Sequence, residues 1–411
     1  MAKFFKLSYV YIFTIVVYYT VIIVNDFGFI SSGYSISRLF AIPLLLVTFL
    51  YFLFYFPFFY NKTLKIGFFR YLIFLIFIYT IYYLLSIFNI NYYDNLDSSI
   101  QLRVFFTALL WMLSFINFFT IGYKIQFKES AIKKFSVILY ILASGVIFSD
   151  IYYELKGGDI INTSTGYTVL MIMPLLMYLY KNRVFQILML TIGITLISGK
   201  RGALVIEAVI LLYYFINSRK IKVKQKKTFY SYVSSFLILI AIIGIGYYAY
   251  NYAWDSLQTR FLDIFIGTER SGEIGYGSGR SIFWLMAFNT WYESSVFNNF
   301  LGLGFYSTSN TLLKLFGIPI QAHNDYIEIL HCFGIVGLAV YLMFQFKLFS
   351  FIKKVSPLKI NRFILYVSLI ILVGRSLFAG ILYRPDTLLL AISIGFIIGD
   401  LYRKKQLYHE N

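Results

Sequence analysis

The stretch "YIEILHCFGIVGLAVYLMFQFKLFS" (326–350) decides the fold, because it holds one carboxylate and one lysine in a long apolar run. As a helix with a rise of about 1.5 Å per residue, a run of this length exceeds the ~30 Å hydrocarbon core of a bilayer. The stretch therefore predicts a membrane-spanning helix.

Runs of similar character recur along the 411 residues, of which 60% are hydrophobic and 13% charged. A soluble domain is closer to half apolar and a quarter charged. The sequence predicts an all-α polytopic membrane protein, a single integral membrane domain over residues 1–411. We expect about twelve transmembrane helices, with segments six to eight short: 5–24, 39–60, 71–90, 103–122, 135–153, 167–180, 184–199, 202–217, 229–251, 326–350, 363–383 and 387–402.

The basic residues predict the orientation of these spans. When the N-terminus is placed in the cytoplasm, the inner loops, the termini and the adjoining span ends carry 25 of the 36 Lys and Arg residues and only three acids. This bias predicts that both termini are cytoplasmic. The basic runs, such as "SRKIKVKQKK" (218–227), are typical of a face toward anionic lipid, so no nucleic-acid partner is expected.

One loop is long, and the same orientation makes residues 252–325 extracytoplasmic. Within it, "SIFWLMAFNTWYES" (281–294) predicts an amphipathic helix at the membrane interface. One Cys and three His exclude a disulfide framework and are too few for a zinc-type site, so no metal or cofactor is expected. Cys332 is interpreted as a small core residue.

Polar residues precede the opening stretch, in "PIQAHND" (319–325). Asn324 or Asp325 could cap the helix, with His323 as an ordinary flanking residue. Ionisable groups at this depth are also a functional-site signal, which includes Glu328. Both interpretations stay open, and His331, about two turns further on, is expected to be packed and hydrogen-bonded.

Several arginines fall on the outer side. Lys200 and Arg201 lie in the turn "ISGKRGALV" (197–205), where glycine lets backbone N–H groups approach an anion that a guanidinium can bind bidentately. The loop adds Arg260, Arg270 and Arg280. For each arginine alone, an interfacial side chain or ion pair is an equal alternative, and Arg270 lies close to two glutamates, at 269 and 273.

Three further arginines bear on the same surface. Arg375, in "LVGRSLFAG" (372–380), is predicted within a span and needs a partner there, either Glu207 or a bound phosphate. Arg103 and Arg384 are predicted at the outer surface, where they would extend a basic rim.

Four motifs occur in order: "SGKRGA" (198–203), "SGRSIFW" (278–284), "LGLGFYS" (301–307) and "AHNDYIEILHCFGIVGLAVYL" (322–342). Together they resemble the O-antigen ligase and polymerase superfamily of bacterial membrane glycosyltransferases, most firmly over about 195–345. The resemblance implies a metal-independent, GT-C-like helical enzyme in the bacterial inner membrane. It would use undecaprenyl-pyrophosphate-linked glycans at the periplasmic face, in O-antigen and lipopolysaccharide biosynthesis.

The resemblance also implies roles for residues. Arg201 and Arg280 would bind the lipid pyrophosphate, as would Arg260, whose surroundings "LQTRFLD" are less distinctive. Lys200 and Arg375 are candidates for the same anion. His323 would serve the acceptor, because an imidazole with a pKa near ~6.5 suits a general base at neutral pH. Asp325 or Glu328 would orient the ring or replace it.

The expected function is a polysaccharide repeat-unit polymerase that transfers a growing chain to a fresh lipid-linked unit with inversion. A ligase that passes the chain to lipid A core or to protein is the close alternative. The arginine–ten residues–glycine pattern of some polymerases is not present at Arg260 or Arg280. A lipid-linked glycan flippase is a more distant alternative. Partners are the lipid-linked oligosaccharide, membrane lipids and a chain-length regulator protein.

Overall fold

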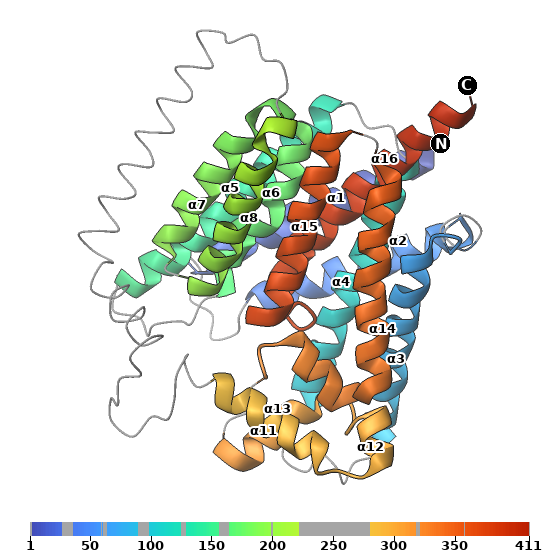
Figure 1. Ribbon diagram of the computed structural model, residues 1–411, viewed down its shortest axis with the longest axis vertical. Coiled ribbons are helices and arrows are strands. Elements are labelled where there is room, and N and C mark those ends of the chain that lie inside the picture. The colour runs from blue at the N-terminus through green and yellow to red at the C-terminus, as the bar shows by residue number, and fades with distance from the viewer. Residues whose placement is uncertain are drawn as a thin grey trace.

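The structure, a computed structural model, describes residues 2–26, 36–58, 60, 64–88, 98–124, 129–155, 164–198, 200–221, 280–317, 321–356 and 358–410 (Figure 1). Throughout these ranges the regular elements are helices. They are α1 (Ala2–Asp26), α2 (Ile36–Phe58), α3 (Gly67–Phe88), α4 (Ser98–Lys124), α5 (Glu129–Leu155), η3 (Ser164–Tyr167), α6 (Thr168–Leu179), η4 (Lys181–Arg183), α7 (Val184–Ile197), α8 (Arg201–Ile221), α11 (Arg280–Tyr292), α12 (Val296–Leu301), α13 (Ser307–Phe316), α14 (Asp325–Val355), α15 (Lys359–Phe378), η6 (Pro385–Thr387) and α16 (Leu388–Glu410).

The all-α polytopic fold is confirmed. Eleven of the twelve predicted spans coincide with α1–α8 and α14–α16, and the remaining segment, 229–251, lies outside the described residues. Seven of the described helices are long and apolar enough to cross a membrane, namely α1–α5, α14 and α15. The helices predicted to be short are short, with 12 residues in α6 and 14 in α7.

Helix α4 lies at the centre of the bundle. In the apolar span of α4, 83% of the residues are buried, whereas in the apolar span of α2 only 22% are. The other side chains of α2 are therefore available to contact lipid. Close packing on α16 explains the difference, because side chains added at Gly395 and Gly399 would meet the α4 backbone at Phe115 and Phe119. Small residues four apart let two membrane helices approach in this way.

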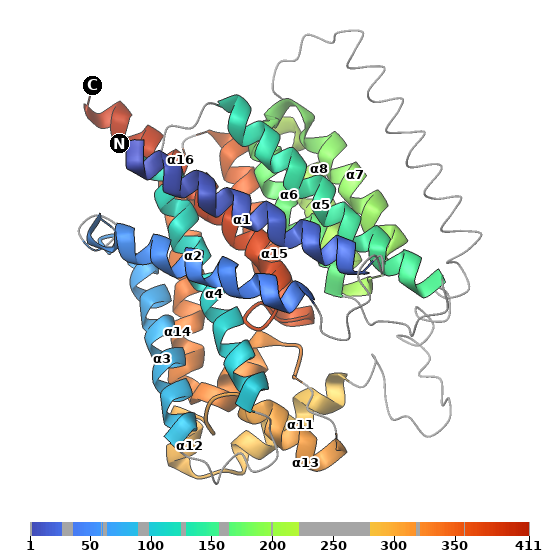
Figure 2. The same ribbon diagram turned by 180° about the vertical axis from the view of Figure 1, so that it is seen from behind.

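The two ends of the bundle differ in what they hold. The N- and C-termini lie side by side at one end, and α11, α12 and α13 gather at the other in both views (Figures 1 and 2). Lys405 donates to the carbonyl of Lys354 at 3.0 Å, which joins the end of α16 to the end of α14. We call this the basic end, because one cavity there is lined by Lys133, Lys181, Arg183, Arg403 and Lys404. The opposite end is called the site end.

Helix α14 is interrupted at Gly334, whose φ of 65° and ψ of −165° are not helical. The kink frees the carbonyls of His331 and Cys332, which accept from the N–H groups of Leu303 and Gly304 at 2.8 and 3.1 Å. A side chain at Gly334 would overlap the backbone of Phe300. The motif "LGLGFYS" is therefore docked, backbone to backbone, into the kink of the long helix.

The site end differs from the prediction in one boundary. Helix α15 ends at Phe378 rather than at 383, and residues 379–384 form a turn that leads through η6 into α16. The helix predicted around 281–294 is present as α11, and it exposes Leu285, Met286 and Phe288. This apolar surface is of the kind that lies in a membrane interface.

Candidate functional site at the end away from the termini

His323 lies directly before α14 and has a positive φ of 54°. Such a conformation is uncommon outside glycine, and histidine is among the residues that tolerate it. Asn324 follows as the N-cap, its side chain accepting from Tyr326 N at 3.0 Å and Ile327 N at 3.3 Å. The capping interpretation is thus confirmed for Asn324, and the cap fixes where the chain presents the imidazole of His323.

A ring partner of His323 is Arg384, from the turn between α15 and α16. Arg384 Nη2 lies 3.2 Å from His323 Nδ1. A guanidinium can only donate hydrogen bonds, so Nδ1 must accept, and a neutral ring then carries its proton on Nε2. In this state the ring can donate to a hydroxyl oxygen through Nε2, but it offers no free lone pair to take a proton.

The two carboxylates beside His323 hold backbone in place. Asp325, 2% exposed, accepts from the N–H groups of Ile381 (3.0 and 2.8 Å) and Leu382 (3.4 Å). Glu328, 1% exposed, accepts from Ala322 N at 3.1 Å. Because a buried carboxylate needs such donors, both acids join the His323 segment to the bundle, and Asp325 binds it to the turn that carries Arg384.

Arg375, at the end of α15, is fully buried, and its partner is Asp386 at 2.8 Å. The guanidinium also stacks 4.0 Å from the centre of the Tyr167 ring. The prediction of Glu207 as partner was wrong, since Glu207 accepts from Thr195. Among the described residues, Nε and Nη1 of Arg375 have no hydrogen-bond partner.

The turn that holds Lys200 and Arg201 adjoins this ion pair. Arg201 is the first residue of α8, and a side chain at the next residue, Gly202, would meet Tyr167 and Phe378. Lys200 is half-buried and packs close to Gly166. The start of α8 and the end of α15 are therefore packed around the same tyrosine.

Arg280 is the first residue of α11, 43 positions before His323 in the sequence. One turn later, Trp284 Nε1 donates to Ala322 O at 2.6 Å. This bond brings α11 alongside the residue that precedes His323. Arg260 and Arg270 lie outside the described residues.

The remaining predicted residues are placed as follows. His331 is buried and bonded to Ser307 Oγ (2.8 Å), so its packed, hydrogen-bonded role is confirmed, and Cys332 is a buried core residue. Arg103 is exposed on α4. Close by, burial raises the pKa of Tyr306, and Arg103 acts weakly in the opposite direction.

His323 and Arg384 line a small recess together with Gln321, Gly380 and Tyr383. The ring of Tyr383 lies 5.9 Å from that of Tyr306. Burial raises the pKa of Tyr383 well above its ordinary value, so its hydroxyl stays protonated. Among the described residues, no group of three or more His, Cys, Asp and Glu side chains could hold a metal ion.

Sequence reasoning missed Tyr167 and Asp386. Asp386 was visible in "YRPD", two residues after Arg384, but nothing in the sequence indicated that it would pair with Arg375 eleven residues earlier. Tyr167 is one of 38 tyrosines in the chain, so its residue type carried no signal.

Comparison with known proteins agrees with the motifs. Residues 186–342 match the family described as O-antigen ligase, a region that contains α7, α8, α11–α13, the His323 segment and the kink of α14. No curated protein matches the chain. The match supports a function of the O-antigen ligase or polymerase type, acting on lipid-linked oligosaccharide in a membrane. Residues 186–342 are therefore similar to this family, in agreement with the resemblance of the motifs to the O-antigen ligase and polymerase superfamily.

Proposed function

We propose that the protein is a polysaccharide repeat-unit polymerase. It transfers a growing glycan from undecaprenyl pyrophosphate to the non-reducing end of a new lipid-linked unit. The site end would face the periplasm, and the basic end, with both termini, the cytoplasm of a bacterial cell. The side-by-side termini and the excess of basic residues around them support this orientation.

The observation that carries the proposal is the contact between His323 and Arg384. Helix α11 lies next to this contact. Its Trp284 donates a hydrogen bond to the carbonyl of Ala322, the residue before His323. In this proposal the imidazole activates the nucleophile and the neighbouring guanidinium binds phosphate. The imidazole precedes α14, the guanidinium lies in the α15–α16 turn, and α11 packs beside the imidazole. These three elements are far apart in sequence.

In the proposed reaction an acceptor hydroxyl oxygen attacks the anomeric carbon of the donor sugar. The new carbon–oxygen bond forms as the bond to the pyrophosphate breaks, and undecaprenyl pyrophosphate leaves with the electron pair. Arginines stabilise the developing negative charge without a metal, an effect typically worth several kcal/mol. The hydroxyl proton passes to His323. A direct displacement of this kind inverts the anomeric configuration.

Arg384 gives this scheme an order of events. While Arg384 donates to Nδ1, His323 orients a hydroxyl through Nε2–H and cannot accept its proton. Binding of the diphosphate draws Arg384 to the phosphate oxygens and releases Nδ1. The ring proton then moves from Nε2 to Nδ1, so that the Nε2 lone pair can take the hydroxyl proton. Donor binding therefore precedes activation of the acceptor.

The other cationic residues divide between two tasks. Arg201, Lys200 and Arg280 stand at the starts of helices at the site end and are proposed to bind the pyrophosphate, with Arg260 from the loop. Arg375 is fully buried, so it contributes its positive charge from behind the turn and keeps that turn in place. Asp325 and Glu328 position the backbone around the imidazole.

A ligase that uses the same site on lipid A core or protein is the second candidate, because the matched family is described by that activity. The aromatic-rich composition, with 21% aromatic residues, favours the polymerase slightly. A flippase is less favoured, since its cations should line a central path, whereas most of the predicted outer arginines lie in loops or at helix ends.

Purified full-length protein, incubated with a lipid-linked repeat unit as its sole substrate, tests the proposal. A ladder of products supports the polymerase. Product that forms only after lipid A core is added would establish the ligase. The absence of transfer under both conditions, with lipid-linked units still translocated in cells, would favour the flippase.

A further inference from the structure

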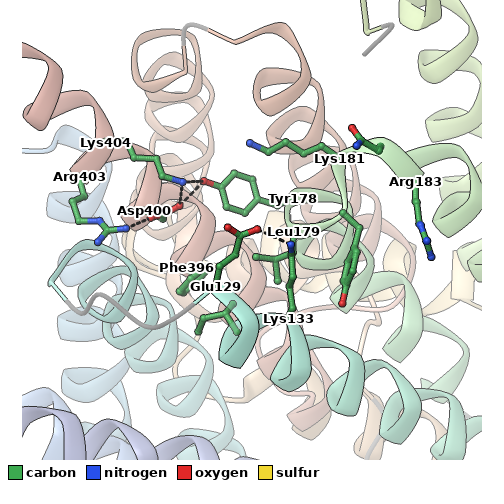
Figure 3. Close-up of a pocket in the computed structure, with 13 residues that line it drawn as sticks. Glu129, Lys133, Tyr178, Leu179, Lys181, Arg183, Phe396, Asp400, Arg403 and Lys404 are labelled. Carbon is green, nitrogen blue, oxygen red and sulfur yellow. Dashed lines mark hydrogen bonds and ion pairs between the residues drawn. The ribbon is translucent and has the colours of Figure 1, made fainter. Parts of the chain in front are cut away.

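A cavity lies at the basic end, opposite the site. Its volume is about 590 Å³. Figure 3 shows its walls, which come from the start of α5, the end of α6, η4 and residues 396–404 of α16. The chain segments that meet here are inner loops and the C-terminal tail, so the cavity opens where helices leave the bilayer.

The lining of the cavity carries an excess of positive charge. It contains five basic and two acidic residues: Lys133, Lys181, Arg183, Arg403, Lys404, Glu129 and Asp400. Both acids are already engaged. Glu129 pairs with Lys133 at 2.6 Å, and Asp400 pairs with Arg403 at 2.5 Å and with Lys404 at 2.6 Å. Lys181 and Arg183 form no ion pair with any described residue.

Two of these cations lie near the same aromatic ring. The Nζ of Lys181 lies 4.8 Å from the centre of the Tyr178 ring, and that of Lys404 lies 5.6 Å from the same ring. In Figure 3, Lys181 extends across the cavity toward Lys404. Burial and the neighbouring Lys404 lower the pKa of Lys181. Asp400, which pairs with Lys404, and Glu129 act in the opposite direction on this pKa.

We propose that this cavity binds the phosphate headgroup of an anionic phospholipid, with Lys181 and Lys404 as the principal contacts. Basic pockets between membrane helices on the cytoplasmic side are suited to such headgroups. The volume falls in the range of small-molecule sites, about 300–1,000 Å³. The acyl chains would lie along the exposed apolar surfaces of the neighbouring helices, and the glycan site at the other end takes no part.

Thermal unfolding of the purified full chain in neutral detergent tests the proposal. We expect added phosphatidylglycerol to raise the Tm, while phosphatidylcholine or millimolar inorganic phosphate does not. In Lys181→Gln the rise falls to half or less, and in Lys181→Glu it is lost. Lys134→Gln is the matched control, because Lys134 is an exposed lysine next to Lys133 that does not line the cavity, and it keeps the full rise.

Native mass spectrometry separates lipid binding from stability. The wild-type protein should retain phosphatidylglycerol that the folded Lys181→Glu protein loses. Equal retention by the two proteins, or an equal Tm rise in both, would overturn the site. A rise that inorganic phosphate reproduces in full would overturn the lipid as its occupant.

Discussion

The two ends of the bundle treat charge in opposite ways. At the site end, Arg375 and the carboxylates of Asp325 and Glu328 are almost wholly buried, and each is held by a specific partner. At the basic end, Lys181 and Arg183 are at least partly exposed and belong to a cavity with excess positive charge. The first arrangement fixes a geometry, while the second leaves charge available to a ligand.

This difference between the two ends follows from the free-energy cost of burying a charged group. A charge removed from water is tolerated only when it is paired and hydrogen-bonded, so a buried group holds its surroundings in one arrangement. The turn from 379 to 387 shows this, because Asp325 binds its start and Arg375 binds its end through Asp386. Arg384 lies between these two anchors and is thereby presented to His323.

The largest effect is expected when the buried pair is broken. Arg375→Leu leaves Asp386 without its partner and should lower the free energy of unfolding by about 3–5 kcal/mol. The double variant Arg375→Leu/Asp386→Leu should recover part of that loss. Arg403→Gln is the comparison at the basic end, where Arg403 is partly exposed and Asp400 keeps Lys404, so we expect a smaller loss. Denaturant titration in mixed micelles measures all three, and similar losses at both ends would contradict the comparison.

Gly334→Ala should come next. The φ of 65° and ψ of −165° belong to a region that is essentially restricted to glycine, which costs another residue about 1–3 kcal/mol. The added methyl group also meets the backbone of Phe300. Thermal unfolding in detergent measures the loss, with Gly317→Ala as control, since a positive φ there meets open space. An equal loss of stability in both variants would show that the docking of "LGLGFYS" into the kink does not contribute to the stability of the protein.

Arg384→Gln tests the proposed role of Arg384 at the site. Loss of a charged hydrogen bond to the diphosphate, worth about 1.5–3 kcal/mol, should slow transfer roughly ten- to a hundredfold. Arg384→Lys keeps the charge without the planar fork and should lie between that variant and the wild type. Initial rates of product formation at several donor concentrations distinguish the variants. Wild-type rates in Arg384→Gln would remove Arg384 from the mechanism.

The smallest effect is expected for Lys134→Gln, an exposed residue at the basic end. Surface substitutions of this kind change stability by at most about 0.5 kcal/mol. The rate of transfer should also be unchanged, because the site lies at the opposite end. A decrease comparable to that of Arg384→Gln would show that the two ends do not act separately.

The sequence predicted the spans because their length and hydropathy are local properties. The α14 helix followed from such patterns alone. The pairing of Arg375 with Asp386 did not, because sequence does not say which helices are neighbours or that α15 ends at Phe378. The same limit applies to Asp325, whose carboxylate binds backbone N–H groups 56 and 57 residues away.

The site was predicted in part for a similar reason. His323 was recognisable because an ionisable residue at the start of a span is unusual. Its contact with Arg384, 61 residues later, depends on how α14 packs against the α15–α16 turn. That packing also decides which ring nitrogen is an acceptor, and no sequence pattern carries this information.

The most direct measurement is the transfer rate of purified His323→Asn with a lipid-linked repeat unit as donor and acceptor. Asparagine tolerates the positive φ of this position, so the variant should fold like the wild type while lacking an imidazole. A general base typically contributes about 10²–10⁴ to the rate, so we predict a loss of at least about a hundredfold. A folded His323→Asn protein that makes product within about twofold of the wild-type rate would contradict the placement of glycosyl transfer at His323.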